Sequence, residues 1–146
     1  MKLYTIGFTK KTAEQFFSLL ESNGIRRLID IRVHPGGQLA GFSKKDDLAY
    51  FLSRLIDCDY HHLATLAPSD EILSDYRSDS NWGTYVQRFE ALMDQRGVPE
   101  VLARRLFEEK TCCLLCSEAT PDKCHRRLVA ERFARYWPDI NVIHLA

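Results

Sequence analysis

Residues 111–116 read Thr-Cys-Cys-Leu-Leu-Cys, a strongly apolar run that a polar segment follows at once. Cys124 and His125 lie in that polar segment. An apolar run of this length is typical of a strand that is buried on both faces of a sheet. The stretch therefore predicts a buried strand, then a short polar connection, then a helix that begins at residues 120–122.

Outside this stretch, strand patterns and helix patterns alternate along the chain. Further strands are predicted at residues 2–7, 27–32, 59–63 and 140–145. Helices are predicted after Thr9 or Thr12, after Ser43, and with breaks between Pro68 and Phe107. Alternation of this kind predicts a mostly parallel sheet covered on both faces. We expect residues 1–146 to form a single α/β domain: a three-layer α/β/α fold with about five strands and a helical insertion.

Capping residues set the predicted helix boundaries. Ser43 and Asp46 fit a capping box, in which each side chain accepts a hydrogen bond from a free backbone N–H. Asn23-Gly24 ends the first helix, and Gly97 ends another. Pro99 suits the first turn of the helix after that.

The composition excludes several classes of protein. The chain has 146 residues, and its 20 Lys plus Arg balance 20 Asp plus Glu, which argues against a broad nucleic-acid surface. Hydrophobic residues make up 45%, which is too high for a disordered chain. No run approaches the roughly 18 apolar residues of a membrane span, and no signal peptide is evident. The five cysteines, an odd number, predict free thiols in a reducing, cytoplasmic compartment.

Polar residues follow two of the predicted strands. Asp30, Arg32 and His34 come at or after the end of one strand, and Cys116 and Glu118 end the other. In open parallel sheets, ligands bind beyond the carboxyl ends of the strands. These side chains should therefore converge on one edge of the sheet, where the Asp–Arg pair either orients a loop or holds a ligand.

Cys116 is the candidate nucleophile. A helix N-terminus favours negative charge, and a nearby cation lowers the pKa of a thiol. His125 and Glu118 are the candidate proton-transfer groups, and Arg126 is the candidate clamp on an anion. His125 should face the sheet, whereas Cys124, a candidate ligand-binding residue, should point toward the line of Leu128. The sequence leaves open whether Cys116 and Cys124 approach closely enough to form a redox pair. The alternative remains that Cys116 is simply a packed thiol.

A metal site is a further alternative. Cys116, Glu118, Cys124 and His125 include suitable donor atoms, and His34 could add another. The Cys-x7-Cys-His spacing differs from the tight pairs of structural zinc sites, so no metal ligand is predicted. We expect the remaining candidates to be structural: Cys58, Cys112 and Cys113, His61 and His62, and the stripe that contains Trp82 and Tyr85.

Several short motifs occur in order along the chain: Asp30-x-Arg32, Pro35, Phe42, His62-Leu63, Leu66-Ala67-Pro68, Trp82 with Tyr85, Leu115-Cys116-x-Glu118 and Cys124-His125-Arg126. Through these motifs the chain resembles the domain-of-unknown-function 488 family over essentially its whole length. The resemblance brings no established reaction. It implies that the polar signature residues belong together: Asp30, Arg32, Cys116, Glu118, Cys124, His125 and Arg126.

A partial likeness connects the chain to rhodanese-type sulfurtransferases and cysteine phosphatases, which place a cysteine between a strand and a helix N-terminus. Nine residues separate Cys116 from Arg126, too many for the compact anion-binding loop of either group, and Pro121 interrupts them. This likeness is an analogy alone.

The function predicted first is binding of an anionic ligand, such as a nucleotide, a nucleic-acid end or a phosphate or sulfur species, at the carboxyl edge of the sheet. One alternative is a cysteine-dependent enzyme of the sulfur- or phosphoryl-transfer type that uses Cys116. Another is a structural metal or polar-network module. The sequence points to no particular cofactor, no membrane partner and no particular oligomeric state.

Overall fold

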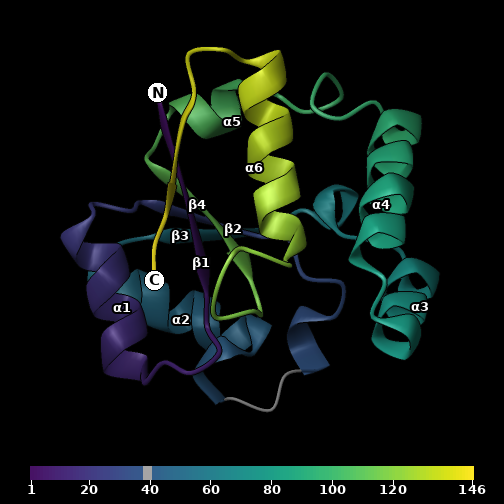
Figure 1. The fold of residues 1–146 in the computed structure, drawn as a ribbon. Coiled ribbons are helices and arrows are strands. Elements are labelled where there is room, and N and C mark those ends of the chain that lie inside the picture. Colours follow the sequence, from purple (N-terminus) through teal and green to yellow (C-terminus); the bar gives the residue numbers. More distant parts are fainter. Residues whose placement is uncertain (38–40) are drawn as a thin grey trace.

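In a computed structural model, which describes residues 1–37 and 41–146, five parallel strands form one sheet (Figure 1). The strands are β1 (Lys2–Gly7), β2 (Arg27–Asp30), β3 (Asp59–His62), β4 (Cys112–Cys116) and β5 (Asn141–His144). They lie in the order β3-β2-β4-β1-β5, and every neighbouring pair is parallel. The predicted sheet is therefore confirmed, with β4 at its centre.

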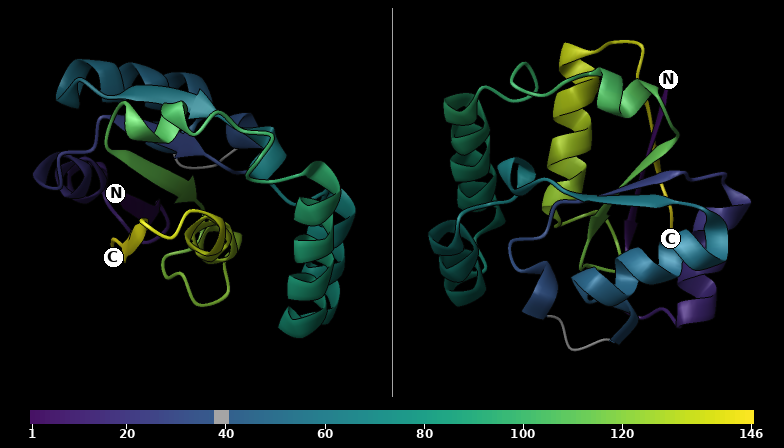
Figure 2. Two further views of the ribbon diagram at one scale, coloured as in Figure 1. Left: turned by 90° about the horizontal axis from the view of Figure 1, so that it is seen from above. Right: turned by 180° about the vertical axis from the view of Figure 1, so that it is seen from behind.

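Helices cover both faces of this sheet. They are α1 (Ala13–Ser22), α2 (Lys45–Ile56), α3 (Asp70–Asp79), α4 (Trp82–Arg96), α5 (Arg105–Glu108) and α6 (His125–Tyr136). Phe16 of α1 and Leu48 of α2 pack against one face, whereas Phe89 of α4 and Phe133 of α6 pack against the other. Figure 2 shows the α3–α4 hairpin standing outside α6, which is the helical insertion of the predicted three-layer fold. No helix within the described residues is long and apolar enough to cross a membrane.

Local capping explains where two helices begin and end. The Thr12 hydroxyl accepts a hydrogen bond from the N–H of Gln15 at 3.1 Å, and the Gln15 side chain accepts one from the N–H of Thr12 at 2.9 Å. Helix α1 thus begins with a capping box. Gly24 and Gly97 follow the ends of α1 and α4 with φ of +69° and +70°, a conformation that favours glycine.

The capping box predicted for α2 is wrong. A 3₁₀ turn at Gly41–Ser43 buries Ser43 and delays the start of the helix to Lys45. Lys44 occupies the N-cap position, and no side chain caps the helix there.

Two other predicted helix starts are also wrong. The chain around Pro99 makes turns in place of a helix, with the N–H of Leu102 donating to the Pro99 carbonyl at 2.8 Å, and α5 begins only at Arg105. Helix α6 begins at His125 rather than at residues 120–122. The reason is the backbone of Cys124, which is still extended at φ −134° and ψ 139°.

The order of the strands creates a crevice between the carboxyl ends of β2 and β4. From β2 the chain runs through α2 to β3, whereas from β4 it runs through α6, on the opposite face, to β5. Connections that diverge in this way leave room for a ligand at the strand ends. Gly7 pairs with Cys116 at this edge, and any side chain there would overlap the backbone carbonyl of Glu118. The loop after β4 therefore lies directly on the end of β1.

Candidate functional site

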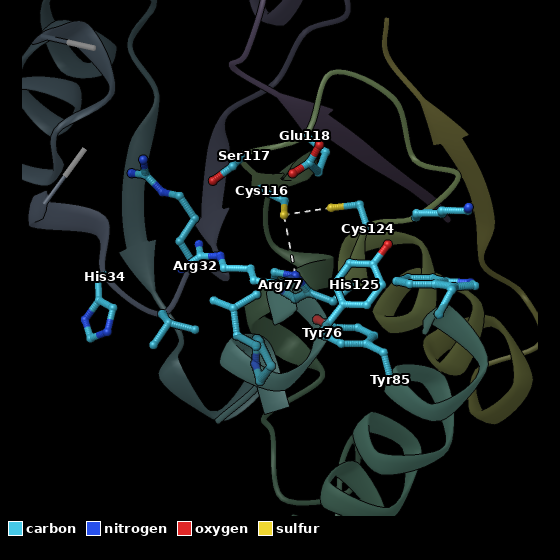
Figure 3. Close-up of a pocket in the computed structure, with 15 residues that line it drawn as sticks. Arg32, His34, Tyr76, Arg77, Tyr85, Cys116, Ser117, Glu118, Cys124 and His125 are labelled. Carbon is cyan, nitrogen blue, oxygen red and sulfur yellow. Dashed lines mark hydrogen bonds between the residues drawn. The ribbon is translucent and has the colours of Figure 1, made fainter. Parts of the chain in front are cut away.

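A pocket of about 160 Å³ opens at this crevice (Figure 3). Its base is formed by Cys116 at the end of β4 and by Cys124 and His125 at the start of α6. Its walls come from the segment after β2, the loop after β4 and the α3–α4 hairpin. Three connections that are distant in sequence thus meet around one group of reactive side chains.

Cys116 and His125 form a buried pair. Sγ of Cys116 lies 3.5 Å from Nδ1 of His125, and Nε2 of His125 donates a hydrogen bond to the carbonyl of Ile31 at 2.7 Å. Because a carbonyl oxygen only accepts, Nε2 carries a proton and Nδ1 is left to exchange a proton with the thiol. His125 faces the sheet, as expected, and its ring lies 5.8 Å from that of Phe89. The chain segment after β2 thus orients the imidazole toward Cys116.

Cys124 also contacts Cys116. The Cys124 thiol donates a hydrogen bond to Sγ of Cys116 across 2.7 Å, and Figure 3 shows both side chains turned toward each other. The sequence leaves open whether the two thiols approach each other, and the structure shows that they do. The expectation that Cys124 is oriented toward the line of Leu128 is wrong. It assumed that Cys124 follows helical geometry, but this residue precedes the helix and its extended backbone directs the side chain toward the end of β4.

The electrostatics of the three groups are coupled. Burial alone would raise the pKa of Cys116, but the Cys124 thiol, the charge of His125 and the N–H of Glu118 all stabilise the thiolate and hold that pKa well below its usual range. Burial and the neighbouring Cys116 thiolate raise the pKa of Cys124. The pKa of His125 is also raised, because the Cys116 thiolate outweighs the opposing effect of burial. The favoured state is a Cys116 thiolate beside an imidazolium and a neutral Cys124 thiol.

These three side chains could also hold a metal ion. Cys116, Cys124 and His125 each offer one ligand atom, and these atoms lie within 4.8 Å of one another. Two sulfurs and an imidazole suit zinc or copper, and the Ile31 carbonyl would orient the imidazole from outside the ligand shell. Glu118, which was weighed as a fourth donor, is not part of this group.

Arg32 forms one wall of the pocket and is held by Asp30. Nε and Nη2 of Arg32 donate to the two carboxylate oxygens of Asp30 at 2.9 and 2.7 Å, and the Tyr60 hydroxyl donates to the same carboxylate. His62 donates to the Arg32 carbonyl at 2.8 Å, which supports the structural role expected of this histidine. Arg32 is only 3% exposed, and its Nη1 has no hydrogen-bond partner among the residues the structure describes. Asp30 thus fixes a guanidinium that keeps one unused donor.

The other predicted site residues lie at the rim of the pocket or outside it. His34 and Glu118 are exposed residues of the rim, and Nε2 of His34 lies 2.6 Å from a carboxylate oxygen of Asp70. Arg126 is fully buried and is not among the residues that line the pocket. It donates to the backbone carbonyl of Glu118 at 2.6 Å. Arg126 therefore holds the loop after β4 on the sheet, while its Nε and Nη2 have no hydrogen-bond partner among the described residues. Its role as a clamp on an anion stays a prediction.

Residues 12–133 match the family described as domain of unknown function DUF488. The chain belongs to this family. The resemblance drawn from the sequence motifs is therefore confirmed at the level of the family. No curated protein and no solved structure matches the chain.

In this DUF488 domain the α3–α4 hairpin supplies pocket residues that the sequence analysis missed. Tyr76, Trp82 and Tyr85 form an aromatic wall, in which the rings of Trp82 and Tyr85 stack with their centroids 5.0 Å apart. Arg77 and Lys123 add two exposed cations beside this wall. The sequence predicts the stripe that contains Trp82 and Tyr85 as core, and Tyr85 does belong to the core against which Trp82 packs. The helical spacing of these aromatic residues could not reveal that one end of the stripe lines a pocket.

Proposed function

We propose that the chain is a cysteine-dependent enzyme that binds a small anionic substrate at the carboxyl edge of its sheet and attacks it with the Cys116 thiolate. The observation that carries this proposal is the pair formed by Cys116 and Nδ1 of His125, 3.5 Å apart, with Nε2 of His125 committed to Ile31. A thiolate beside an imidazolium, at the base of a pocket, is the arrangement of a nucleophilic cysteine.

The charges around the pocket favour an anionic substrate. Arg32 forms part of the wall, although its Nη1 is buried, and Arg77 and Lys123 add positive charge at the rim, where Glu118 is the one acidic residue among the described residues that line the pocket. The N-terminus of α6, a helix of 12 residues, lies at the base and adds the positive end of its dipole. An anion should therefore bind in this pocket more tightly than a neutral molecule of the same shape.

The volume of the pocket limits the group that reacts. A cavity of about 160 Å³ is close to the roughly 150 Å³ that encloses one benzene molecule. A single ring or a sulfonate- or phosphate-sized group would fill it. A larger substrate would leave the rest of its structure at the rim, between the aromatic wall and Lys123.

The chemical step is a displacement at an electrophilic atom of the substrate. Sγ of Cys116 supplies an electron pair and forms a bond to that atom, and the bond from that atom to the leaving group breaks. The leaving group departs with the released electron pair and takes the proton held at Nδ1 of His125. Sulfur transfer and phosphoryl transfer both follow this scheme.

Binding of an anion without reaction is the second candidate function, and the exposed cations Arg77 and Lys123 beside the pocket favour it. In that case the thiolate would serve only as part of the binding surface. The two candidates differ in what they require of Cys116, because only the enzyme needs a reactive sulfur.

A comparison of two alkylating agents tests the proposal. Iodoacetate carries a carboxylate and iodoacetamide is its neutral counterpart, and N-acetylcysteine gives the intrinsic ratio of their rates. We expect Cys116 to be modified at about pH 6, and to favour iodoacetate about tenfold more than N-acetylcysteine does, with sulfate competing. Peptide mass spectrometry measures the modification site. Modification of Cys116 no faster than Cys58 would overturn the enzyme proposal, and an unchanged reagent ratio would overturn the anion preference.

A further inference from the structure

Cys124 lies beside the proposed nucleophile, but the proposed displacement gives it no role. Its sulfur lies 2.7 Å from Sγ of Cys116, and both residues line the pocket although they are only 3% and 5% exposed. A disulfide bond is about 2.05 Å long. The two sulfurs therefore need to approach by only a fraction of an ångström to become bonded, and a substrate in the pocket reaches both.

The elements that carry the two cysteines allow this approach. Cys116 is the last residue of the central strand β4, and its backbone is held by pairing with Gly7 of β1, whereas the pairing with β2 ends one residue earlier, at Leu115. Cys124 precedes α6, at the end of a loop of residues 117–124, where the backbone is not part of helix or strand. A small movement of Cys124 toward a stationary Cys116 leaves the sheet and helix unchanged.

We infer that Cys116 and Cys124 form a reversible dithiol–disulfide pair, in which Cys116 attacks a small anionic disulfide and Cys124 resolves the product. This inference rests on the proposed function, because it uses the same thiolate and the same pocket. It adds the substrate class and the role of the second cysteine.

The reaction has two displacements. The Cys116 thiolate attacks one sulfur of the substrate, a mixed disulfide forms, and the first half of the substrate leaves as a thiolate that takes the proton held at Nδ1 of His125, so that this nitrogen can accept another proton. Cys124 then loses its proton, attacks Sγ of Cys116, and releases the second half as another thiolate. The two protein thiols lose two electrons and the substrate disulfide gains them. A dithiol reductant returns the protein to its starting state.

The protonation states support this order of events. Cys116 reacts first, because its neighbours already stabilise the thiolate. Cys124 keeps its proton while the charge of Cys116 lies beside it. Once Cys116 is part of a mixed disulfide, that charge is gone and the proton of Cys124 is released more easily. Nδ1 of His125, which lies within 4.8 Å of the Cys124 sulfur, is placed to receive it.

Ellman's reagent is a suitable probe, because each half of this disulfide is an aromatic carboxylate that matches the aromatic wall and the cations of the pocket. Each displacement releases one coloured thionitrobenzoate ion. We expect the wild-type protein to release two ions per chain rapidly and to gain a link between Cys116 and Cys124 in peptide mass spectra. The Cys124→Ser variant should release one ion and keep a stable mixed disulfide, and serine at this N-cap position favours folding. The Cys58→Ala variant, which removes a buried thiol outside the pocket, should still release two.

Other results would overturn the inference in distinguishable ways. One ion per wild-type chain, with a mixed disulfide that persists at Cys116, would contradict resolution by Cys124 and leave the proposed nucleophile intact. No rapid release, together with a Cys116 that is inert to iodoacetate, would contradict both proposals. Release that begins only after a chelator removes stoichiometric zinc would assign the two sulfurs to a metal site rather than to a dithiol.

Discussion

The two ends of strand β4 carry cysteines that are equally buried and chemically opposite. Cys112 and Cys113 lie at its amino end and Cys116 at its carboxyl end, and all three are at most 5% exposed. Burial raises the pKa of Cys112 to about 12 and that of Cys113 well above its usual range, whereas the pKa of Cys116 is lowered. Burial alone therefore does not determine whether a thiol in this strand is protonated.

The partners of each sulfur explain the difference. Burial is the main cause of the raised pKa of Cys112, the charge of Asp59 raises it further, and the thiol donates to the backbone carbonyls of Lys110 and Leu106 at 3.3 and 3.6 Å. Cys116 faces donors: the imidazole of His125, the thiol of Cys124 and the N–H of Glu118. The carboxyl edge of a parallel sheet collects such donors, because helix N-termini and loops meet there.

The largest expected effect is the contrast in reactivity between these two ends. At pH 7 a thiol with a pKa of about 12 is ionised in about 1 molecule in 10⁵. We expect iodoacetamide to modify Cys116 at least about 10³-fold faster than Cys112 in the folded protein. Mass spectrometry of the digested protein measures both rates. In denaturant the two cysteines should react alike, and a contrast that persisted there would mean that the fold is not its cause.

A smaller effect is expected when the imidazole is removed. The His125→Asn variant loses the positive charge that lowers the pKa of Cys116, so alkylation at about pH 6 should slow by about 10- to 100-fold, because each pKa unit changes the thiolate fraction tenfold. The rate should recover as the pH rises through the new, higher pKa. The matched control is His61→Asn on β3, because His61 does not line the pocket. If His125→Asn and wild type had equal rate–pH profiles, the claim that the imidazole lowers the pKa of Cys116 would be wrong.

The smallest effect concerns the cations at the rim. The Arg77→Gln and Lys123→Gln variants each remove an exposed charge, which is worth about 0.2–1 kcal/mol, or about 1.4- to 5-fold. The preference for iodoacetate over iodoacetamide should fall by this factor, and the difference should vanish at high salt. Arg54→Gln on α2 is the control, since Arg54 does not line the pocket. A preference that is unchanged at low salt after the loss of both rim cations would show that they do not contribute to it.

The sheet and the core of the site could be predicted from sequence because they depend on local patterns. The apolar run at residues 111–116 and the alternation around it determine a parallel sheet, and a parallel sheet brings Asp30, Arg32 and Cys116 to one edge. His125 faces the sheet as expected because it shares one helical face with Val129 and Phe133, which are both buried in the core. These inferences need only the periodicity of strands and helices.

The features of the site that could not be predicted depend on where the loop after β4 ends and α6 begins. Helix α6 begins later than expected, and this shift turns Cys124 toward Cys116. It also leaves Arg126 under the loop, against the Glu118 carbonyl, rather than in the pocket. The position of the aromatic wall depends on a related feature: only the three-dimensional packing of the α3–α4 hairpin shows that Tyr76 and Tyr85 line the same pocket as the thiols.

A titration of the Cys116 thiolate tests the central claim most directly. The ultraviolet absorbance of thiolates is followed against pH in the wild-type protein and in Cys116→Ser, and the difference isolates Cys116. The account predicts a midpoint well below the usual thiol value of about 8.5, with the thiolate present above that midpoint and lost as the pH falls through it. A midpoint at or above the usual value would contradict the claim that donors at the carboxyl edge make Cys116 reactive.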